Sequence, residues 1–189
     1  MIDDDTLMTQ TARGDEDAFR LLVARWEQPV VAFLVYMLGS IDEAQDLAQD
    51  TFLKVYDQAA RYEPGGRFRS WLMRIAGNKA RSTLRRRKVL RWVNFDLTSH
   101  DQAAPGDDPA QSLERQETSR RVRAAVARLP ERQRQAVVLK RFQDFSYKEI
   151  AEVLDTTVPA VESLLQRAAE ALRHELADDI EPAQREVGS

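Results

Sequence analysis

The sequence of 189 residues contains no cysteine and only two histidines, His100 and His174. The lack of cysteine excludes disulfide bonds, thiolate metal sites and a cysteine nucleophile. The two histidines lie far apart in the chain, so a histidine-based metal site or catalytic triad is not expected. We therefore expect no catalytic residue, no metal and no cofactor.

Long apolar runs and export signals are also missing. The longest uninterrupted apolar run, residues 30–38, has nine residues, whereas a membrane-spanning helix needs about 20. The chain begins MIDDD, which is acidic where a secretion signal would be basic. These features predict a cytoplasmic protein without membrane insertion.

The formal net charge of −3 hides a strong segregation of charge. Residues 1–60 hold 4 basic and 12 acidic side chains, whereas residues 61–92 hold 11 basic side chains and 1 acidic one. The acidic excess returns in residues 93–119, and residues 120–189 are balanced. A polyanion is expected to bind the basic segment, which leaves the acidic segments for a basic partner.

The apolar residues recur at helical spacing, and no segment alternates as a strand does. We predict an all-α protein with two small helical domains, residues 1–92 and 113–177. Residues 93–112, rich in aspartate and proline, are predicted to form a flexible acidic linker, and residues 178–189 a polar tail.

Two positions interrupt this helical pattern. Pro29 lies within a long apolar helix and removes a backbone donor, which predicts a kink near Gln28 or two abutting helices. Gly77 and Asn78 lie in the middle of a later helix, although both are poor helix formers. Such residues either bend a helix or serve a contact.

The stretch from Phe68 to Arg91 combines an apolar helix face with many cations. Phe68, Trp71 and Ile75 follow helical spacing, and seven of the residues from 79 to 91 are lysine or arginine. Aromatic rings beside cations suit a surface that meets single-stranded or opening nucleic acid. A core helix that ends in a solvated basic tail fits the stretch equally well.

Residues 147–166 are spaced like a helix-turn-helix. Apolar residues stand where two such helices face each other, a small residue where they approach, and Asp155 in the turn, where it tolerates a left-handed backbone. The packing residues are Ile150, Ala151, Leu154, Val161 and Leu164. A plain helical hairpin is the alternative.

The second helix of this unit would enter the major groove of DNA. Its outer face leaves Ser163, Gln166 and Arg167 for DNA, because Glu162 repels phosphates and Ala160 offers only a methyl group. Cations on the preceding helices would have to help. They are Arg132, Arg134, Lys140, Arg141 and Lys148.

Taken together, these motifs resemble the extracytoplasmic-function sigma factors of bacterial RNA polymerase. GDEDAFRLLVARW looks like the start of sigma domain 2, and DEAQDLAQDTFLKVY like its polymerase-binding segment. FRSWLMRIAGNKARSTLRRR resembles the segment that melts and reads the promoter −10 element. LPERQRQAVVLKRFQDFSYKEIAEVL and VPAVESLLQRA resemble domain 4, which binds the −35 element.

This resemblance implies a promoter-specificity factor without enzymatic activity. Its partners would be core polymerase, through the β′ clamp helices and the β flap, promoter DNA, and an anti-sigma factor. The implied polymerase-binding residues are Asp46, Gln49, Asp50 and Phe52, on a helix whose acidic face would otherwise be taken as merely solvated. The implied −10 DNA-binding residues are Arg74, Asn78, Lys79, Arg81, Arg85, Arg86 and Arg87. The implied −35 DNA-binding residues are Arg141, Lys148, Ser163, Gln166 and Arg167.

Within this resemblance, Asn78 matches the position that holds a flipped-out base, whereas Trp71 is expected to pack in the core first. Ala160, Glu162 and Leu164 depart from the family's −35 helix and leave the −35 sequence open. Two other functions stay open from the residues alone: a DNA-binding regulator of the ordinary helix-turn-helix kind, and an enzyme that acts on nucleic acid.

Overall fold

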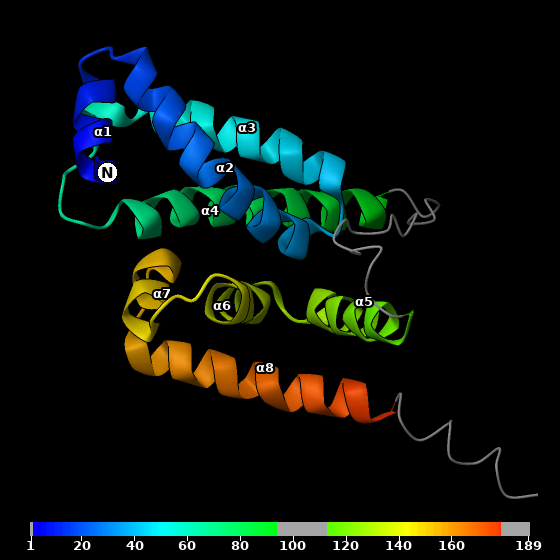
Figure 1. Ribbon diagram of the computed structural model, residues 1–189. Helices are drawn as coiled ribbons and strands as arrows, with labels where there is room; N and C mark the ends of the chain where they lie inside the picture. Colours follow the sequence, from blue (N-terminus) through cyan, green and yellow to red (C-terminus); the bar gives the residue numbers. More distant parts are fainter. Residues whose placement is uncertain (1, 94–112, 179–189) are drawn as a thin grey trace, which may run out of the picture.

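The computed structural model describes residues 2–93 and 113–178. The expected linker, apart from residue 93, and the expected tail, apart from residue 178, lie outside the described residues. Within the described ranges the chain forms eight α-helices, one short 3₁₀-helix and no strand, which confirms the all-α prediction (Figure 1). The helices are α1 (Asp4–Ala12), α2 (Glu16–Leu38), α3 (Ile41–Asp57), η1 (Ala59–Arg61), α4 (Phe68–Val93), α5 (Leu113–Arg128), α6 (Glu131–Phe142), α7 (Tyr147–Leu154) and α8 (Val158–Asp178).

Local capping sets the ends of the first helices. The Asp3 carboxylate accepts a hydrogen bond from the Thr6 amide at 2.9 Å, and Asp15 accepts one from the Ala18 amide at 3.0 Å. Each satisfies an amide that has no partner inside its helix. Gly39 closes α2 with φ of +79°, a conformation that glycine adopts without steric cost.

The second helix, α2, is continuous through Pro29, so of the two predicted alternatives, a kink or two abutting helices, the second is wrong. By length and composition α2 is apolar enough to cross a membrane, but a core helix meets the same criterion. In this structure α2 packs against α1, α3 and α4. Leu22, Val30 and Phe33 on α2 are fully buried. These contacts identify α2 as the central helix of the N-terminal group.

The loop before α4 is fastened to α1 by one carboxylate. Asp5 accepts hydrogen bonds from the Tyr62 hydroxyl at 2.5 Å and from the amides of Gly65 and Gly66 at 2.7 and 2.6 Å. Partial burial works to raise the pKa of Asp5, but the hydrogen bonds from Tyr62 and the two amides outweigh it and lower that pKa. This contact holds the loop where α4 begins.

Replacing Asp5 by asparagine should therefore destabilise the protein by roughly 2 kcal/mol at pH 7, because hydrogen bonds to a charged acceptor are lost. Because the pKa of Asp5 is lower in the folded protein than in the unfolded chain, its ionised carboxylate stabilises the fold above the unfolded-state pKa. This stabilisation is lost as the pH falls through the folded-state pKa. Urea unfolding should thus show a smaller loss of stability below about pH 4 in Asp5→Asn than in wild type. Asp17→Asn, at an exposed carboxylate, is the matched control, and equal effects of both variants would contradict this role.

The C-terminal helices form the predicted helix-turn-helix. Ser146 and Glu149 make a complete capping box at the start of α7, and Asp155 ends α7 with φ of +50°. Ile150, Leu154 and Val161 are buried where α7 meets α8. Helix α8 also packs along α6 and α5 (Figure 1).

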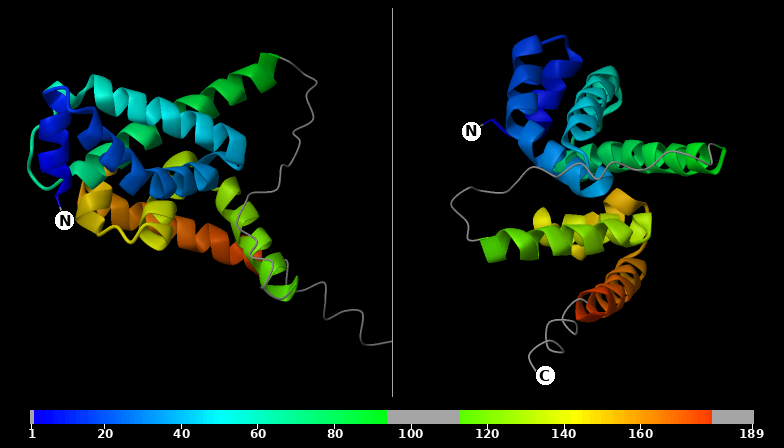
Figure 2. Two further views of the ribbon diagram at one scale, coloured as in Figure 1. Left: turned by 45° about the horizontal axis from the view of Figure 1, so that its top comes forward. Right: turned by 90° about the vertical axis from the view of Figure 1, so that its right-hand side faces the viewer.

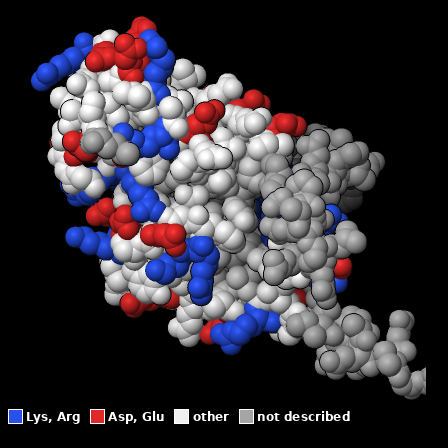
Figure 3. Space-filling view, in the orientation of Figure 1, with Lys and Arg blue, Asp and Glu red and all other residues white. Residues whose placement is uncertain are grey.

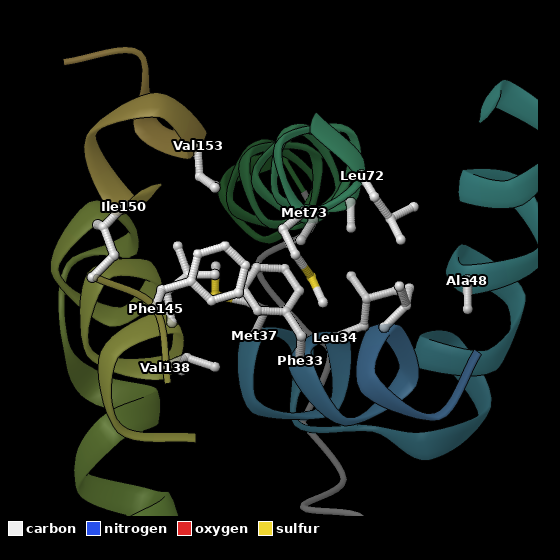
Figure 4. Close-up of a cluster of buried hydrophobic side chains, with 14 of the residues drawn as sticks. Phe33, Leu34, Met37, Ala48, Leu72, Met73, Val138, Phe145, Ile150 and Val153 are labelled. Atoms are coloured by element: carbon white, nitrogen blue, oxygen red, sulfur yellow. The ribbon is translucent and has the colours of Figure 1, made fainter. Parts of the chain in front are cut away.

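The two groups of helices lie against each other and share one hydrophobic core (Figures 1 and 2). Figure 4 shows Phe33 and Met37 of α2 and Met73 of α4 facing Phe145 and Val138. Phe145, in the loop before α7, is fully buried. Full burial of one such side chain contributes roughly 1.5–3 kcal/mol. The sequence predicted two domains but gave no indication of this contact between them.

Candidate nucleic-acid and polymerase interfaces

One face of α4 carries four of the predicted −10 residues in register. Arg74, Asn78, Arg81 and Arg85 follow one another at intervals of three and four, which places them in one row along the helix. Arg74, Asn78 and Arg85 are exposed, and Arg81 is half-buried. The Arg81 guanidinium donates a hydrogen bond to the Asn78 side-chain oxygen, which orients the amide. The row offers three cations to phosphates and one amide to a base edge.

The remaining predicted −10 residues differ in their surroundings. Arg86 is exposed. The Lys79 ammonium lies 3.7 Å from the Asp50 carboxylate of α3. Arg87 donates to the Leu38 carbonyl at 3.0 Å and pairs with Glu43. Lys79 and Arg87 thus bind α4 to α2 and α3, which leaves them less available to DNA than the row on the exposed face.

The aromatic residues at the start of α4 divide between core and surface. Phe68 is buried, at 2% exposure, and Trp71 is half-buried. The Trp71 ring centroid lies 5.0 Å from that of Tyr62 and 6.0 Å from that of Phe68. Trp71 thus packs against the core, as expected, but also borders the surface, whereas Phe68 lies within the core.

A cleft of about 570 Å³ is lined by the start of α4 and the loop before it on one side and by α7 and the start of α8 on the other. Trp71 and Tyr62 line it together with cations from both groups of helices and three carboxylates. Figure 3 shows basic and acidic side chains mixed along this side of the molecule. The cleft brings Arg74, a predicted −10 residue, together with Lys148, a predicted −35 residue. The charged lining residues are Arg61, Glu63, Arg67, Arg74, Lys148, Glu152 and Asp155.

The third helix presents the predicted polymerase-binding residues unequally. Asp46, Gln49 and Asp50 are exposed, but Phe52 is only 6% exposed. Phe52 is therefore chiefly a core residue. Only the small exposed part of its side chain, which lines a neighbouring groove, can contact a partner. Leu53, the next residue, is 63% exposed.

This groove, of about 560 Å³, lies between α2 and α3. Its walls are mostly apolar, with Glu27, Gln45 and Gln49 among the lining residues. The apolar lining residues are Phe19, Val23, Val31, Ala48, Phe52 and Leu53. An apolar groove flanked by exposed carboxylates suits a helix that carries apolar and basic side chains. This groove was not predicted from the sequence. The available signal was Leu53, a leucine that lies outside the buried stripe of the amphipathic helix α3.

The outer face of α8 presents Ser163, Gln166 and Arg167 to solvent, as predicted from the spacing. Gln166 donates to the Glu170 carboxylate at 3.2 Å, and the Arg167 guanidinium to the Ser163 carbonyl at 3.2 Å. The side chains of Gln166 and Arg167 are polar and exposed, so replacing these hydrogen bonds by contacts to DNA would cost little free energy. Glu162 is also exposed, on the same helix as the three predicted −35 residues.

The lysines and arginines that were expected to assist α8 in binding DNA divide into two sets. Arg141 and Lys148 are exposed. Arg132 donates to the Leu154 carbonyl at 3.0 Å, and Lys140 lies 5.1 Å from the Tyr147 ring centroid. Arg134 is half-buried and donates to the Met37 carbonyl of α2 at 2.7 Å. Burial lowers the pKa of Arg134. Arg134 is thus occupied by a contact between the two groups of helices.

Known proteins match both groups of helices. Residues 22–89 match the family described as Sigma-70 region 2, and residues 119–172 match Sigma-70, region 4. The sigma factor CarQ of Myxococcus xanthus is 37% identical over 166 residues, which are 87% of this chain and 92% of that protein. The extracytoplasmic-function (ECF) sigma factor SigW of Bacillus subtilis is 31% identical over 176 residues, 89% of this chain and 94% of that protein.

This chain belongs to the ECF sigma factors of RNA polymerase. The structure of CnrH in complex with the cytosolic domain of CnrY superimposes with a TM-score of 0.71 at 28% identity, over 93% of this chain and 98% of that one. The sigma region 2 match contains the α4 row and all residues that line the α2–α3 groove except Phe19, and the region 4 match contains the helix-turn-helix. The chain is therefore a sigma factor that directs polymerase to promoters.

Proposed function

We propose that this sigma factor docks on core polymerase through the α2–α3 groove and the acidic face beside it. Asp46, Gln49 and Asp50 are exposed next to Leu53, so apolar contact and charge attraction act on one partner surface. Contact with the partner would remove the exposed apolar surface of Leu53 from water, which favours binding. The β′ clamp helices are the proposed partner at this groove.

The row on α4 then opens the −10 element. This row, exposed within the region 2 match, is the observation that carries the proposal. Arg74, Arg81 and Arg85 hold phosphates, while the Asn78 amide meets the edge of an unstacked base. Unstacking costs a few kcal/mol per base, and capture of the base by the protein offsets this cost. Arg86 adds a further phosphate contact.

The helix-turn-helix anchors the −35 element. Arg141 and Lys148 contact phosphates, and Gln166 and Arg167 reach base edges with Ser163 beside them. Few side chains on α8 can read bases, so phosphate contacts supply most of the affinity there. Polymerase contacts of this half are proposed to lie on the β flap.

The proposed functional division follows the two sigma regions. Residues 1–92 would form domain 2, residues 113–177 domain 4, and residues 93–112 the connection between them. We propose that the protein acts in the cytoplasm, where polymerase works, and that it has no enzymatic activity. An anti-sigma factor is a further proposed partner, in keeping with a relative, CnrH, whose structure contains a second protein.

Promoter opening tests this proposal against an ordinary DNA-binding regulator. The sigma factor alone should bind duplex DNA weakly, and with core polymerase it should unpair the −10 element, read by permanganate reactivity of unpaired thymines. Tight duplex binding by the chain alone, without opening when core is added, would favour the regulator. A divalent-metal-dependent nuclease activity that persists in Asn78→Ala would favour an enzyme.

A further inference from the structure

Val89 is an exposed apolar residue near the end of α4, and it follows directly after four consecutive cations. Residues 85–88 read RRRK, and Val89 is 61% exposed. Leu84, earlier on the same helix, packs against the core. Valine is also a poorer helix former than lysine or arginine. Neither core packing nor helix propensity accounts for a valine at this position, which points to a contact with another molecule.

Val89 continues the row of predicted −10 residues along α4. It lies four positions after Arg85, the last member of that row, so the two side chains share one face of the helix. Leu90, the next residue, is 52% exposed, but it is turned roughly 100° away around the helix axis. Figure 2 shows the end of α4 extending beyond the helices around it, so a large partner can reach Val89.

The charges around Val89 favour DNA as that partner. Arg85 and Arg86 are exposed. The Lys88 side chain is 77% exposed, although its ammonium lies 3.4 Å from the Glu131 carboxylate. These three cations precede Val89 within about one turn of the helix, where they can hold phosphates. A polyanion bound by them would cover Val89.

Val89 would meet DNA that is still paired, upstream of the base held by Asn78. From Asn78 to Val89 the helix rises roughly 16 Å, which matches about five base pairs of duplex. The chain continues from α4 to the C-terminal helices, which are proposed to bind the −35 element, so the end of α4 points upstream. This step rests on the proposed function, because it uses the positions assigned to both promoter elements.

A valine can read only one feature of the major groove. Its side chain has no hydrogen-bond donor or acceptor, whereas the base edges in that groove present donors, acceptors and one apolar group, the methyl group of thymine. Contact between Val89 and this methyl group removes apolar surface of both partners from water. The edges of adenine, guanine and cytosine offer no equivalent group.

We propose that Val89 reads a thymine, through its methyl group, in the duplex just upstream of the −10 element. What Val89 recognises is thus the methyl group rather than the hydrogen-bonding pattern of the base. Deoxyuridine, which pairs as thymine does but lacks the methyl group, is not recognised. 5-Methylcytosine, which carries a methyl group at the same ring position, is recognised in place of thymine.

Exchange of thymine for deoxyuridine tests the proposal one position at a time. A promoter that the protein opens with core polymerase should carry an A·T pair at each position in turn over one turn of duplex, about ten base pairs, upstream of the −10 element. The thymine and deoxyuridine forms carry different labels and compete for one sample of polymerase with sigma factor. Wild type should prefer thymine about fourfold, the worth of one buried methyl group, at a single position. 5-Methylcytosine should be preferred over cytosine there by a similar factor.

Two variants separate this contact from other effects of the methyl group. Val89→Ser should bind the thymine and deoxyuridine forms equally, whereas Leu90→Ser, at the neighbouring exposed residue, should keep the wild-type ratio. Both positions are exposed, so both variants should fold, which circular dichroism checks. Because the two templates compete in one sample, a change in affinity for core polymerase does not alter their ratio. An effect of the methyl group on base stacking alone would persist in Val89→Ser.

A wild-type ratio near one at every position would overturn the proposal. So would an unchanged ratio in Val89→Ser, or an equal loss of the preference in both variants. In each of these cases, promoter opening by the wild type would leave the proposed function standing. Failure of the wild type to open any promoter would contradict the proposed function and this inference together.

Discussion

Replacing Leu53 by aspartate should weaken binding to core polymerase at least about tenfold, which corresponds to roughly 1.4 kcal/mol. Leu53 is 63% exposed at the α2–α3 groove, so its folded-state contacts are few and the fold should persist. Full burial of a leucine side chain in a complex removes apolar surface from water and is worth roughly 1.5–3 kcal/mol. An added carboxylate would also have to be desolvated in the interface.

Leu21→Asp provides a matched control. Leu21 is 52% exposed on α2 but does not line the groove. Titration of core polymerase with labelled sigma factor should therefore show a large loss for Leu53→Asp and little change for Leu21→Asp. The groove would lose its proposed role if both variants bound like wild type, or if both lost affinity equally.

Asp50→Arg should also weaken core binding, but it is a less specific probe. Asp50 lies 3.7 Å from Lys79 of α4. A charge reversal there places two cations together and changes the packing of α3 on α4 as well as the outer surface. Leu53 has no such ion pair, which makes its effect easier to assign to the partner.

Replacing Asn78 by alanine should reduce open-complex formation about tenfold and weaken the preference at one −10 base, while core binding persists. An amide that pairs with a base edge is worth about 1–3 kcal/mol of discrimination. Asn78 is exposed and its amide is oriented by Arg81. Alanine is also the better helix former, so the variant should be no less stable than wild type.

Ser82→Ala, one turn along the same face of α4, is the control for this substitution. Promoter opening should be measured on templates that vary one −10 position at a time. Wild type and Ser82→Ala should share one preference, and Asn78→Ala should lose it at a single position. An unchanged preference in Asn78→Ala would show that another residue reads that base.

The features that depend on near neighbours in sequence were the predictable ones. The left-handed backbone of Asp155 in the turn between α7 and α8 follows from the residue type, because aspartate tolerates that conformation. The all-α class and the helix-turn-helix follow from apolar spacing, which depends only on the geometry of a helix. These predictions are confirmed.

The features that depend on distant residues were not predictable. The sequence predicted that Gly77 either bends the helix or serves a contact. Only the position of Gln135, which lies 58 positions later in the chain, distinguishes the two. Phe52 and Leu53 are adjacent, and the packing of α2 on α3 decides which of them is buried. Likewise Arg134 looked like a DNA-facing cation until the end of α2 supplied its acceptor. Tertiary contacts, rather than helix propensity, settle such choices.

Transcription by purified core polymerase tests the central claim most directly. Core enzyme should be given fragments of its own bacterium's genome with and without the sigma factor, and the 5′ ends of the transcripts sequenced. New transcripts that start at defined sites and share sequence near −10 are expected only when the sigma factor is present. The absence of any sigma-dependent transcript on the whole set of fragments would contradict the central claim.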